Sequence, residues 1–104
     1  GATPIHCACQ SGNKNIIKYL FELGEDINKA NGIGYTPLHC ACRNGNENIV
    51  KYLIEIGADI TKEDNDGECP LFSACWKGHL NIIKYFVGIG TDINKEDKTG
   101  KTLL

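Results

Sequence analysis

The residues in this sequence that could do chemistry are histidines and cysteines in a repeated pattern. His6, Cys7 and Cys9 form a His-Cys-x-Cys sequence, and the same sequence recurs from His39 to Cys42. Imidazole and thiolate groups are common zinc ligands, and a cysteine that contacts a histidine is the pairing that many thiol enzymes use as a nucleophile. The pattern therefore raises two possibilities, a metal site and a catalytic thiol.

Helical spacing argues against both possibilities. Side chains two positions apart on a helix point about 200° away from each other, so Cys7 and Cys9 do not readily bind one tetrahedral zinc ion. His6 and Cys9 share a helix face, but two ligands do not complete a site. His6 and Cys7 are sequence neighbours and diverge, whereas a nucleophile needs its base in contact. We therefore expect no catalytic residue, no cofactor and no metal, and we interpret the cysteines as small buried hydrophobic residues.

Composition and charge exclude several classes of partner. Eleven Lys and Arg residues against thirteen Asp and Glu residues give a net charge of -2. The sequence contains no cluster of basic residues that could bind along a phosphate backbone. No apolar run approaches the roughly 20 residues that cross a bilayer, and the N-terminus lacks the pattern of a signal peptide. We expect no nucleic acid and no membrane as partners. Reduced, buried thiols favour an intracellular and cytoplasmic location.

The elements that would position these residues repeat along the chain. Cys9, Cys42 and Cys75 lie 33 residues apart, and the sequence Thr-Pro-Leu-His-Cys-Ala-Cys at 36–42 matches 3–9 closely and 69–75 more loosely. A period of this length indicates a solenoid or an array. The 104 residues therefore divide into units at 1–33, 34–66 and 67–99 and the start of a further unit at 100–104. We expect a segment of a longer solenoid.

Each unit carries the signals of two short helices and a loop. Thr3 is a good N-cap and Pro4 suits the first helical position, so a helix is predicted from Pro4 to Gly12. A second helix is predicted from about Asn15 to Leu23, with an apolar face and with Gly24 as its left-handed cap. Helices this short are not stable alone, so the units must stack side by side.

These features resemble the ankyrin repeat family over the whole chain. The matching residues are the Thr-Pro-Leu-His-x-Ala motif at 36–41, Gly45, Ile49 with Val50, and Gly-Ala-Asp-Ile at 57–60. The resemblance implies an all-α solenoid of stacked helix-turn-helix units joined by hairpin-like loops. It also implies that His6 and His39 bind loop backbone and tie adjacent turns together.

The third unit departs most from the pattern. Cys69 replaces the capping threonine, Phe72 replaces the histidine, and Gly88 falls within the second helix. Loss of a cap costs about 1 kcal/mol and an interior glycine up to about 1 kcal/mol. We expect this unit to be the least stable, unless burial of Phe72 and Trp76 compensates.

Other recurrent polar and aromatic residues receive structural interpretations. The recurrent aspartates each follow a helix-ending glycine and are expected to stabilise turns: Asp26, Asp59 and Asp92. The recurrent tyrosines are expected to be packed or half-buried on the outer face: Tyr19, Tyr52 and Tyr85. His79 follows a glycine between two helices and is expected to be solvated or to cap a helix.

Function is expected where the units differ. By the resemblance, the loop tips and the ends of the first helices line a concave groove that contacts a protein partner of unknown identity. Tyr35, Arg43 and Trp76 are of the types most frequent in binding hot spots. Carried onto this chain, the groove positions are Gln10, Ile33, Tyr35, Arg43, Asn44, Asp66, Glu68, Trp76, Lys77 and Lys101.

The sequence thus predicts a non-catalytic scaffold for protein–protein interaction. Two alternatives stay open. In the first, the segment is a spacer of a longer array and binds nothing itself. In the second, it associates head to tail through the apolar sides of its end units.

Overall fold

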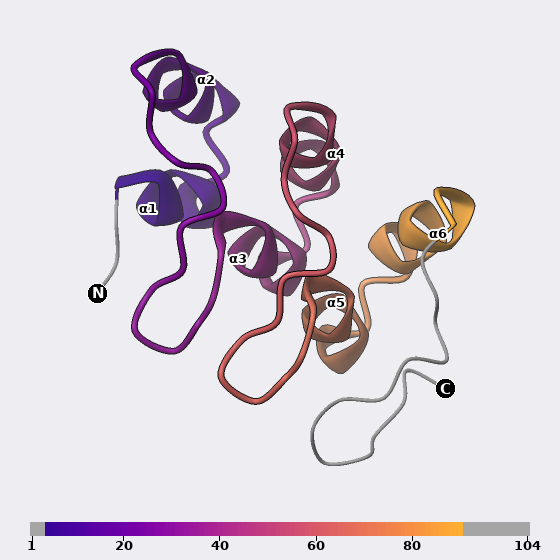
Figure 1. Cartoon of the computed structure of the whole chain (residues 1–104). Helices are drawn as coiled ribbons and strands as arrows, with labels where there is room; N and C mark the ends of the chain where they lie inside the picture. The colour runs from indigo at the N-terminus through magenta and orange to yellow at the C-terminus, as the bar shows by residue number, and fades with distance from the viewer. Residues whose placement is uncertain (1–3, 91–104) are drawn as a thin grey trace.

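Three pairs of helices stack side by side in the computed structural model, which describes residues 4–90 (Figure 1). No strand occurs in this range. The helices are α1 (Pro4–Ser11), α2 (Lys14–Glu22), α3 (Pro37–Asn44), α4 (Glu47–Glu55), α5 (Pro70–Lys77) and α6 (Leu80–Gly88). The all-α, stacked helix-turn-helix fold is confirmed.

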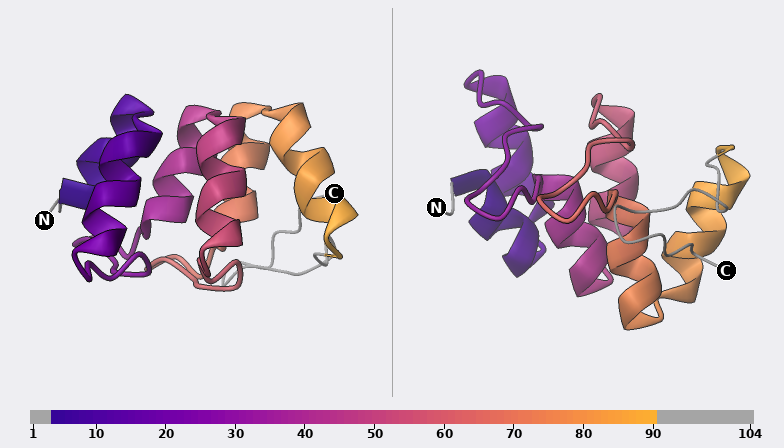
Figure 2. Two further views of the ribbon diagram at one scale, coloured as in Figure 1. Left: turned by 90° about the horizontal axis from the view of Figure 1, so that it is seen from above. Right: turned by 60° about the horizontal axis from the view of Figure 1, so that its bottom comes forward.

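The helices form two rows that are joined by long loops. α1, α3 and α5 make the inner row, and α2, α4 and α6 make the outer row (Figure 1). The α2–α3 and α4–α5 loops project beyond the inner row on one side of the stack (Figure 2). α3 lies between α1 and α5 and packs against both, so the inner row is the continuous part of the stack.

The inner helices begin and end where the sequence predicts. Thr36 is the N-cap of α3: its hydroxyl accepts a hydrogen bond from the backbone N–H of His39, whose side chain in turn accepts from the N–H of Thr36. Gly45 ends the helix in the left-handed conformation, at a φ of 76°. The cap predicted at Thr3 lies outside the described residues.

The outer helix of the first unit starts and ends one residue earlier than predicted. The side chain of Asn13 caps it by accepting a hydrogen bond from the N–H of Ile16 at 3.2 Å. Asn46 caps α4 in the same way, also at 3.2 Å. His79 holds the equivalent position before α6 and makes no capping hydrogen bond, so the capping role expected of His79 is wrong.

Most cysteines are small buried hydrophobic residues, as expected. Cys9, Cys40, Cys42 and Cys69 are buried, and Cys75 is half-buried. Cys7 is exposed, which corrects the prediction for that residue. The equivalent Cys40 is covered because α1 packs against α3, whereas no helix precedes α1 in the described range.

Of the two side chains whose burial was expected to stabilise the third unit, Phe72 and Trp76, one is buried. Cys69 adopts the backbone of an N-cap but makes no side-chain capping bond. Phe72 is buried in the core. Trp76 is 60% exposed, so the expectation that its burial adds stability is wrong. Gly88 is the last residue of α6 rather than an interior one, where its entropic cost is smaller.

Turn aspartates follow the prediction in the described range. A side-chain oxygen of Asp26 accepts the N–H of Asn28 at 2.8 Å, and one of Asp59 accepts the N–H of Thr61 at 2.9 Å. Asp92 lies beyond the described part of the chain.

Two tyrosines of the outer row each make a cation–π contact with a lysine of the preceding unit. Lys14 Nζ lies 4.8 Å from the ring centroid of Tyr52, and Lys51 Nζ lies 5.4 Å from that of Tyr85. Both rings are half-buried, as expected. Tyr19 is 62% exposed, which corrects the prediction, because no described unit precedes it to cover the ring. No helix between residues 4 and 90 is long and apolar enough to cross a membrane.

Candidate functional site

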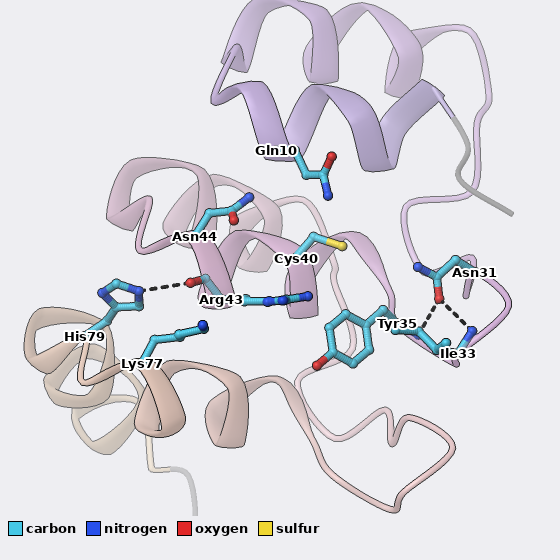
Figure 3. A pocket seen from close by; sticks show the side chains of 9 residues that line it. All are labelled: Gln10, Asn31, Ile33, Tyr35, Cys40, Arg43, Asn44, Lys77 and His79. Carbon is cyan, nitrogen blue, oxygen red and sulfur yellow. Dashed lines mark hydrogen bonds between the residues drawn. The ribbon is translucent and has the colours of Figure 1, made fainter.

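A groove of about 610 Å³ runs along the inner row between the first and third units (Figure 3). Six of the predicted groove residues line it together: Gln10, Ile33, Tyr35, Arg43, Asn44 and Lys77. They come from the end of α1, the α2–α3 loop, α3 and α5. Residues spread over 68 positions of sequence, from Gln10 to Lys77, therefore meet on one surface.

A second hollow of about 260 Å³ continues this groove toward α5. It shares Tyr35, Arg43 and Lys77 with the first hollow and adds Trp76 and Ser73. Tyr35, Arg43 and Trp76 thus lie along one continuous surface, the arrangement that their register predicts.

The remaining predicted residues do not line either hollow. Glu68 accepts a hydrogen bond from the indole N–H of Trp76 at 3.4 Å, which places this carboxylate beside the second hollow. Asp66 is exposed in the α4–α5 loop, where its backbone N–H is bound by the side chain of Asp64 at 2.9 Å. Lys101 lies outside the described residues.

The loop that carries Tyr35 is held by Asn31. One side-chain oxygen of Asn31 accepts the backbone N–H groups of Ile33 and Tyr35, each at 3.0 Å (Figure 3). The N–H of Asn31 donates to the carbonyl oxygen of Tyr35 at 2.8 Å. The ring of Tyr35 stacks on His39 with centroids 5.1 Å apart. Hydrogen bonds thus hold the backbone of this loop, and stacking holds the ring of Tyr35.

Two histidines tie successive loops to the inner row, as expected. His6 Nε2 donates to the carbonyl oxygen of Tyr35 at 2.8 Å, and His39 Nε2 donates to that of Glu68 at 2.9 Å. Both imidazoles are buried. Burial also lowers the pKa of His39 below its ordinary value of 6.5, so the ring is neutral at physiological pH.

A third histidine makes a contact that the sequence did not predict. His79 Nε2 donates to the carbonyl oxygen of Arg43 at 3.0 Å (Figure 3). Its ring also covers Gly45, where an added Cβ would lie 2.5 Å from the imidazole. His79 therefore fastens the third unit to the backbone of a groove residue.

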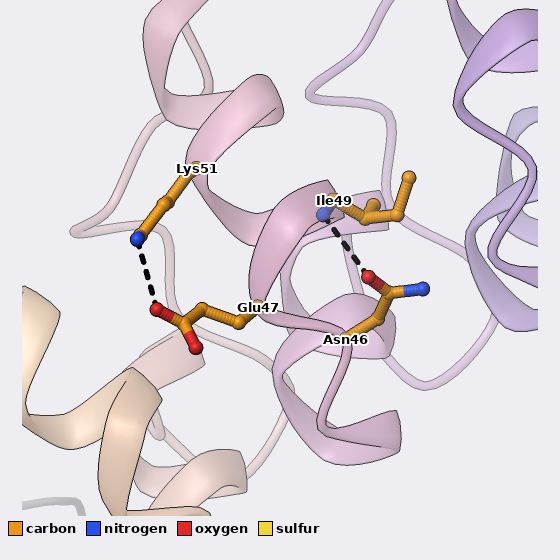
Figure 4. A network of polar contacts seen from close by, with 4 residues as sticks. All are labelled: Asn46, Glu47, Ile49 and Lys51. Carbon is orange, nitrogen blue, oxygen red and sulfur yellow. Dashed lines mark hydrogen bonds and ion pairs between the residues drawn. The ribbon is translucent and has the colours of Figure 1, made fainter.

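The described lining of the groove carries two positive charges and no acidic side chain. Arg43 and Lys77 line both hollows, no Asp or Glu lines either, and neither cation forms an ion pair within residues 4–90. The ion pair in that range, Lys51 with Glu47 at 2.8 Å, lies on the outer helix α4 (Figure 4). The groove is thus more positive than the chain as a whole, whose net charge is -2.

Sequence reasoning missed Asn31, Cys40, Ser73 and His79 among the lining residues. The repeat itself contained a signal for Asn31, because Asp64 stands 33 residues later and binds its own loop in the same way. Asp64 accepts the N–H groups of Asp66 and Glu68, each at 2.9 Å. No equivalent signal marks His79, since the other units have asparagine at that position.

Three of the buried cysteines are poorly suited to nucleophilic chemistry. Burial raises the pKa of Cys9 to about 12 and raises that of Cys42, so both are neutral thiols at physiological pH. Burial also raises the pKa of Cys40, although Arg43 opposes that shift. Within residues 4–90, no group of three or more His, Cys, Asp or Glu side chains is placed to hold a metal ion.

Comparison with known families agrees with this architecture. A family model described as ankyrin repeats in three copies matches residues 26–97, and one described as an ankyrin repeat matches residues 1–29. No curated protein matches the chain. Ankyrin repeats generally mediate protein–protein interactions, and proteins built from them are generally non-catalytic scaffolds. The matches cover most of the chain, and the chain belongs to the ankyrin repeat family.

Proposed function

We propose that this chain binds a protein partner through the concave groove of its inner row and its loops, without catalysing a reaction. The contact residues would be the groove positions Gln10, Ile33, Tyr35, Arg43, Asn44, Trp76 and Lys77. Asp66 and Glu68 would form the rim, and Lys101, outside the described residues, would extend it.

One observation carries this proposal. Side chains from all three helix pairs are exposed on one surface, while the residues beneath them are buried and hydrogen-bonded. Trp76 is 60% exposed and Ile33 is 56% exposed, whereas His39 and Leu71 are fully buried. Large apolar side chains exposed beside cations that form no ion pair within residues 4–90 are typical of a surface that another molecule covers.

The fixed backbone of the groove would favour affinity. Ordering a loop or a side chain on binding costs free energy that reduces the net affinity. Here Asn31, His6 and His39 already bind the backbone of the two loops. A partner would therefore meet a preorganised surface.

Site-specific crosslinking provides the experiment. A photoreactive phenylalanine analogue at Trp76 should crosslink a protein in extracts of the source cells, which mass spectrometry then identifies. The matched control places the same analogue at Tyr19, which is equally exposed but lies on the outer helix α2. A protein crosslinked only from position 76 supports the groove, and equal crosslinking from both positions contradicts it.

Binding of the purified partner then tests the contact residues. Arg43→Ala combined with Trp76→Ala should weaken its affinity at least about tenfold, because central Trp and Arg residues often dominate binding energy. An unchanged affinity would reject the groove and favour a spacer role for this segment.

Head-to-tail association is a second candidate, favoured by exposed apolar side chains on the two end helices of the outer row. Ile16 and Leu23 on the α2 side are 45% and 63% exposed, and Leu80 and Val87 on α6 are 58% and 48% exposed. If these surfaces pair, light scattering should show a mass that rises with protein concentration, and Ile16→Glu should abolish the rise. A constant monomer mass would reject this candidate.

A further inference from the structure

We infer that the partner segment recognised by the groove is a peptide with an acidic side chain flanked by a large apolar one. Its carboxylate would lie against Arg43 and Lys77, and its apolar side chain would pack on Ile33 and Tyr35. This inference rests on the proposed function and specifies the chemistry of the partner.

The charge of the groove is the first support. Arg43 and Lys77 come from neighbouring inner helices, are both exposed, and are not ion-paired within the described range. Both line each of the two hollows, so a group bound there meets two cations. In Figure 3 both side chains extend along the groove toward the side on which Tyr35 lies. A carboxylate would supply the missing counter-charge, and a guanidinium can bind it through two parallel hydrogen bonds.

The apolar surface on either side of these cations is the second support. Ile33 is 56% exposed, and the half-buried ring of Tyr35 is held by its stacking on His39. Trp76 lies in the second hollow with Arg43 and Lys77 and is 60% exposed. A bound segment therefore meets apolar surface next to the cations, which favours an apolar residue next to the acidic one.

The polar side chains of the groove suit a peptide backbone. Gln10 and Asn44 are exposed amides on the first and second inner helices, and each offers a donor and an acceptor for the N–H and C=O groups of an extended peptide. A nucleic acid fits less well. Affinity for a phosphate backbone grows with the number of phosphates that Lys and Arg neutralise, and the part of the groove within residues 4–90 offers two such cations.

Selection from a phage-displayed library of random dodecapeptides tests the inference with the full chain. Enriched peptides should contain Asp or Glu within two positions of Leu, Ile, Phe or Trp. In a synthetic copy of an enriched peptide, replacing the acidic residue by its amide should weaken binding roughly tenfold at low salt and less at high salt.

Charge reversal in the groove sharpens the test. Arg43→Glu with Lys77→Glu should shift the selection toward peptides with Lys or Arg. The matched control is Lys18→Glu with Lys84→Glu, which makes the same change in net charge at exposed positions of α2 and α6. The control should retain the preference for acidic peptides.

The possible failures are distinguishable. If enriched peptides require Tyr35 and Trp76 but show no acidic preference, or bind equally as amides, the inference is wrong and the proposed function stands. If no enriched peptide loses affinity in Arg43→Ala with Trp76→Ala, both are wrong. Binding of a fluorescent oligothymidylate that is lost on the same charge reversal would assign the cations to phosphate and also overturn the inference.

Discussion

The imidazole of His79 donates a hydrogen bond from Nε2 to the carbonyl oxygen of Arg43 at 3.0 Å. This bond joins the turn of the third unit to the end of α3, next to the groove. The imidazole lies so close to Gly45 that a Cβ at this position would force it to move. Glycine at position 45 thus serves two purposes, the left-handed cap of α3 and the close approach of the next unit.

Replacing Gly45 by alanine separates these two purposes. Gly45 and Gly78 are both left-handed C-caps, with φ of 76° and 72°, but an added Cβ has nothing within 4 Å at Gly78. Gly78→Ala should cost about 1–2 kcal/mol of unfolding free energy from backbone strain alone, and Gly45→Ala should cost more. Urea unfolding measures both, and adding His79→Ala should remove the excess. Equal costs would contradict the contact with His79.

Restoring a cap should stabilise the third unit. Cys69 has nearly the same backbone conformation as Thr36, with φ and ψ of -81° and 168° against -87° and 168°. A threonine hydroxyl at position 69 can accept the N–H of Phe72, so Cys69→Thr should raise the unfolding free energy by about 0.5–1 kcal/mol. The converse change, Thr36→Cys, should lower it. If urea unfolding shows that the Cys69→Thr variant is no more stable than the parent, the missing cap does not lower the stability of the chain.

His39 should make stability depend on pH. Burial lowers its pKa in the folded chain below 6.5, so the unfolded chain binds the proton first as the pH falls. His39 should therefore have no effect on the pH dependence of the unfolding free energy above about pH 6.5, its pKa in the unfolded chain. As the pH falls from there to the folded-state pKa, the unfolding free energy should decrease with a slope of at most about 1.4 kcal/mol per pH unit.

The third unit supplies the matched variant for this titration. Phe72 occupies the position equivalent to His39 and is buried, so His39→Phe fits the same place. At pH above 7 the variant should be less stable by about 1–3 kcal/mol, because the bonds to Thr36 and Glu68 are lost. Its stability should fall less between pH 7 and 5 than that of the parent. An identical fall in both proteins would show that His39 does not titrate as described.

Thiol labelling should follow burial. Cys7 is exposed, whereas Cys9 and Cys42 are buried and their pKa values are raised. Iodoacetamide at pH 8 should therefore modify Cys7 first and should reach Cys9 and Cys42 only when the chain unfolds. Peptide mapping by mass spectrometry measures the order, and rapid labelling of Cys42 in the native protein would contradict the buried core.

Local signals made the helices predictable. Thr-Pro at the start and glycine at the end set the bounds of α3, and the 33-residue period carried the same assignment to the other units. The histidine ties followed from the resemblance of the motif. Six of the predicted groove residues meet in one hollow because the repeat brings equivalent positions onto one surface.

What could not be predicted depends on contacts between units. Cys7 and Cys40 are equivalent in sequence, yet only Cys40 is covered, because burial is decided by the neighbouring helix. The same holds for Ile16, which is 45% exposed, and Ile49, which is 1% exposed. His79 reaches the carbonyl oxygen of Arg43, a backbone atom that no residue pattern marks.

The most direct test of the groove is the affinity of the partner that crosslinks at position 76, measured by calorimetry with three proteins. The parent chain and the outer-face control, Tyr19→Ala with Lys84→Ala, should bind with the same affinity. Arg43→Ala with Trp76→Ala should bind at least about tenfold more weakly and should retain the helical content of the parent. Equal affinity of all three proteins would contradict the concave groove as the binding surface.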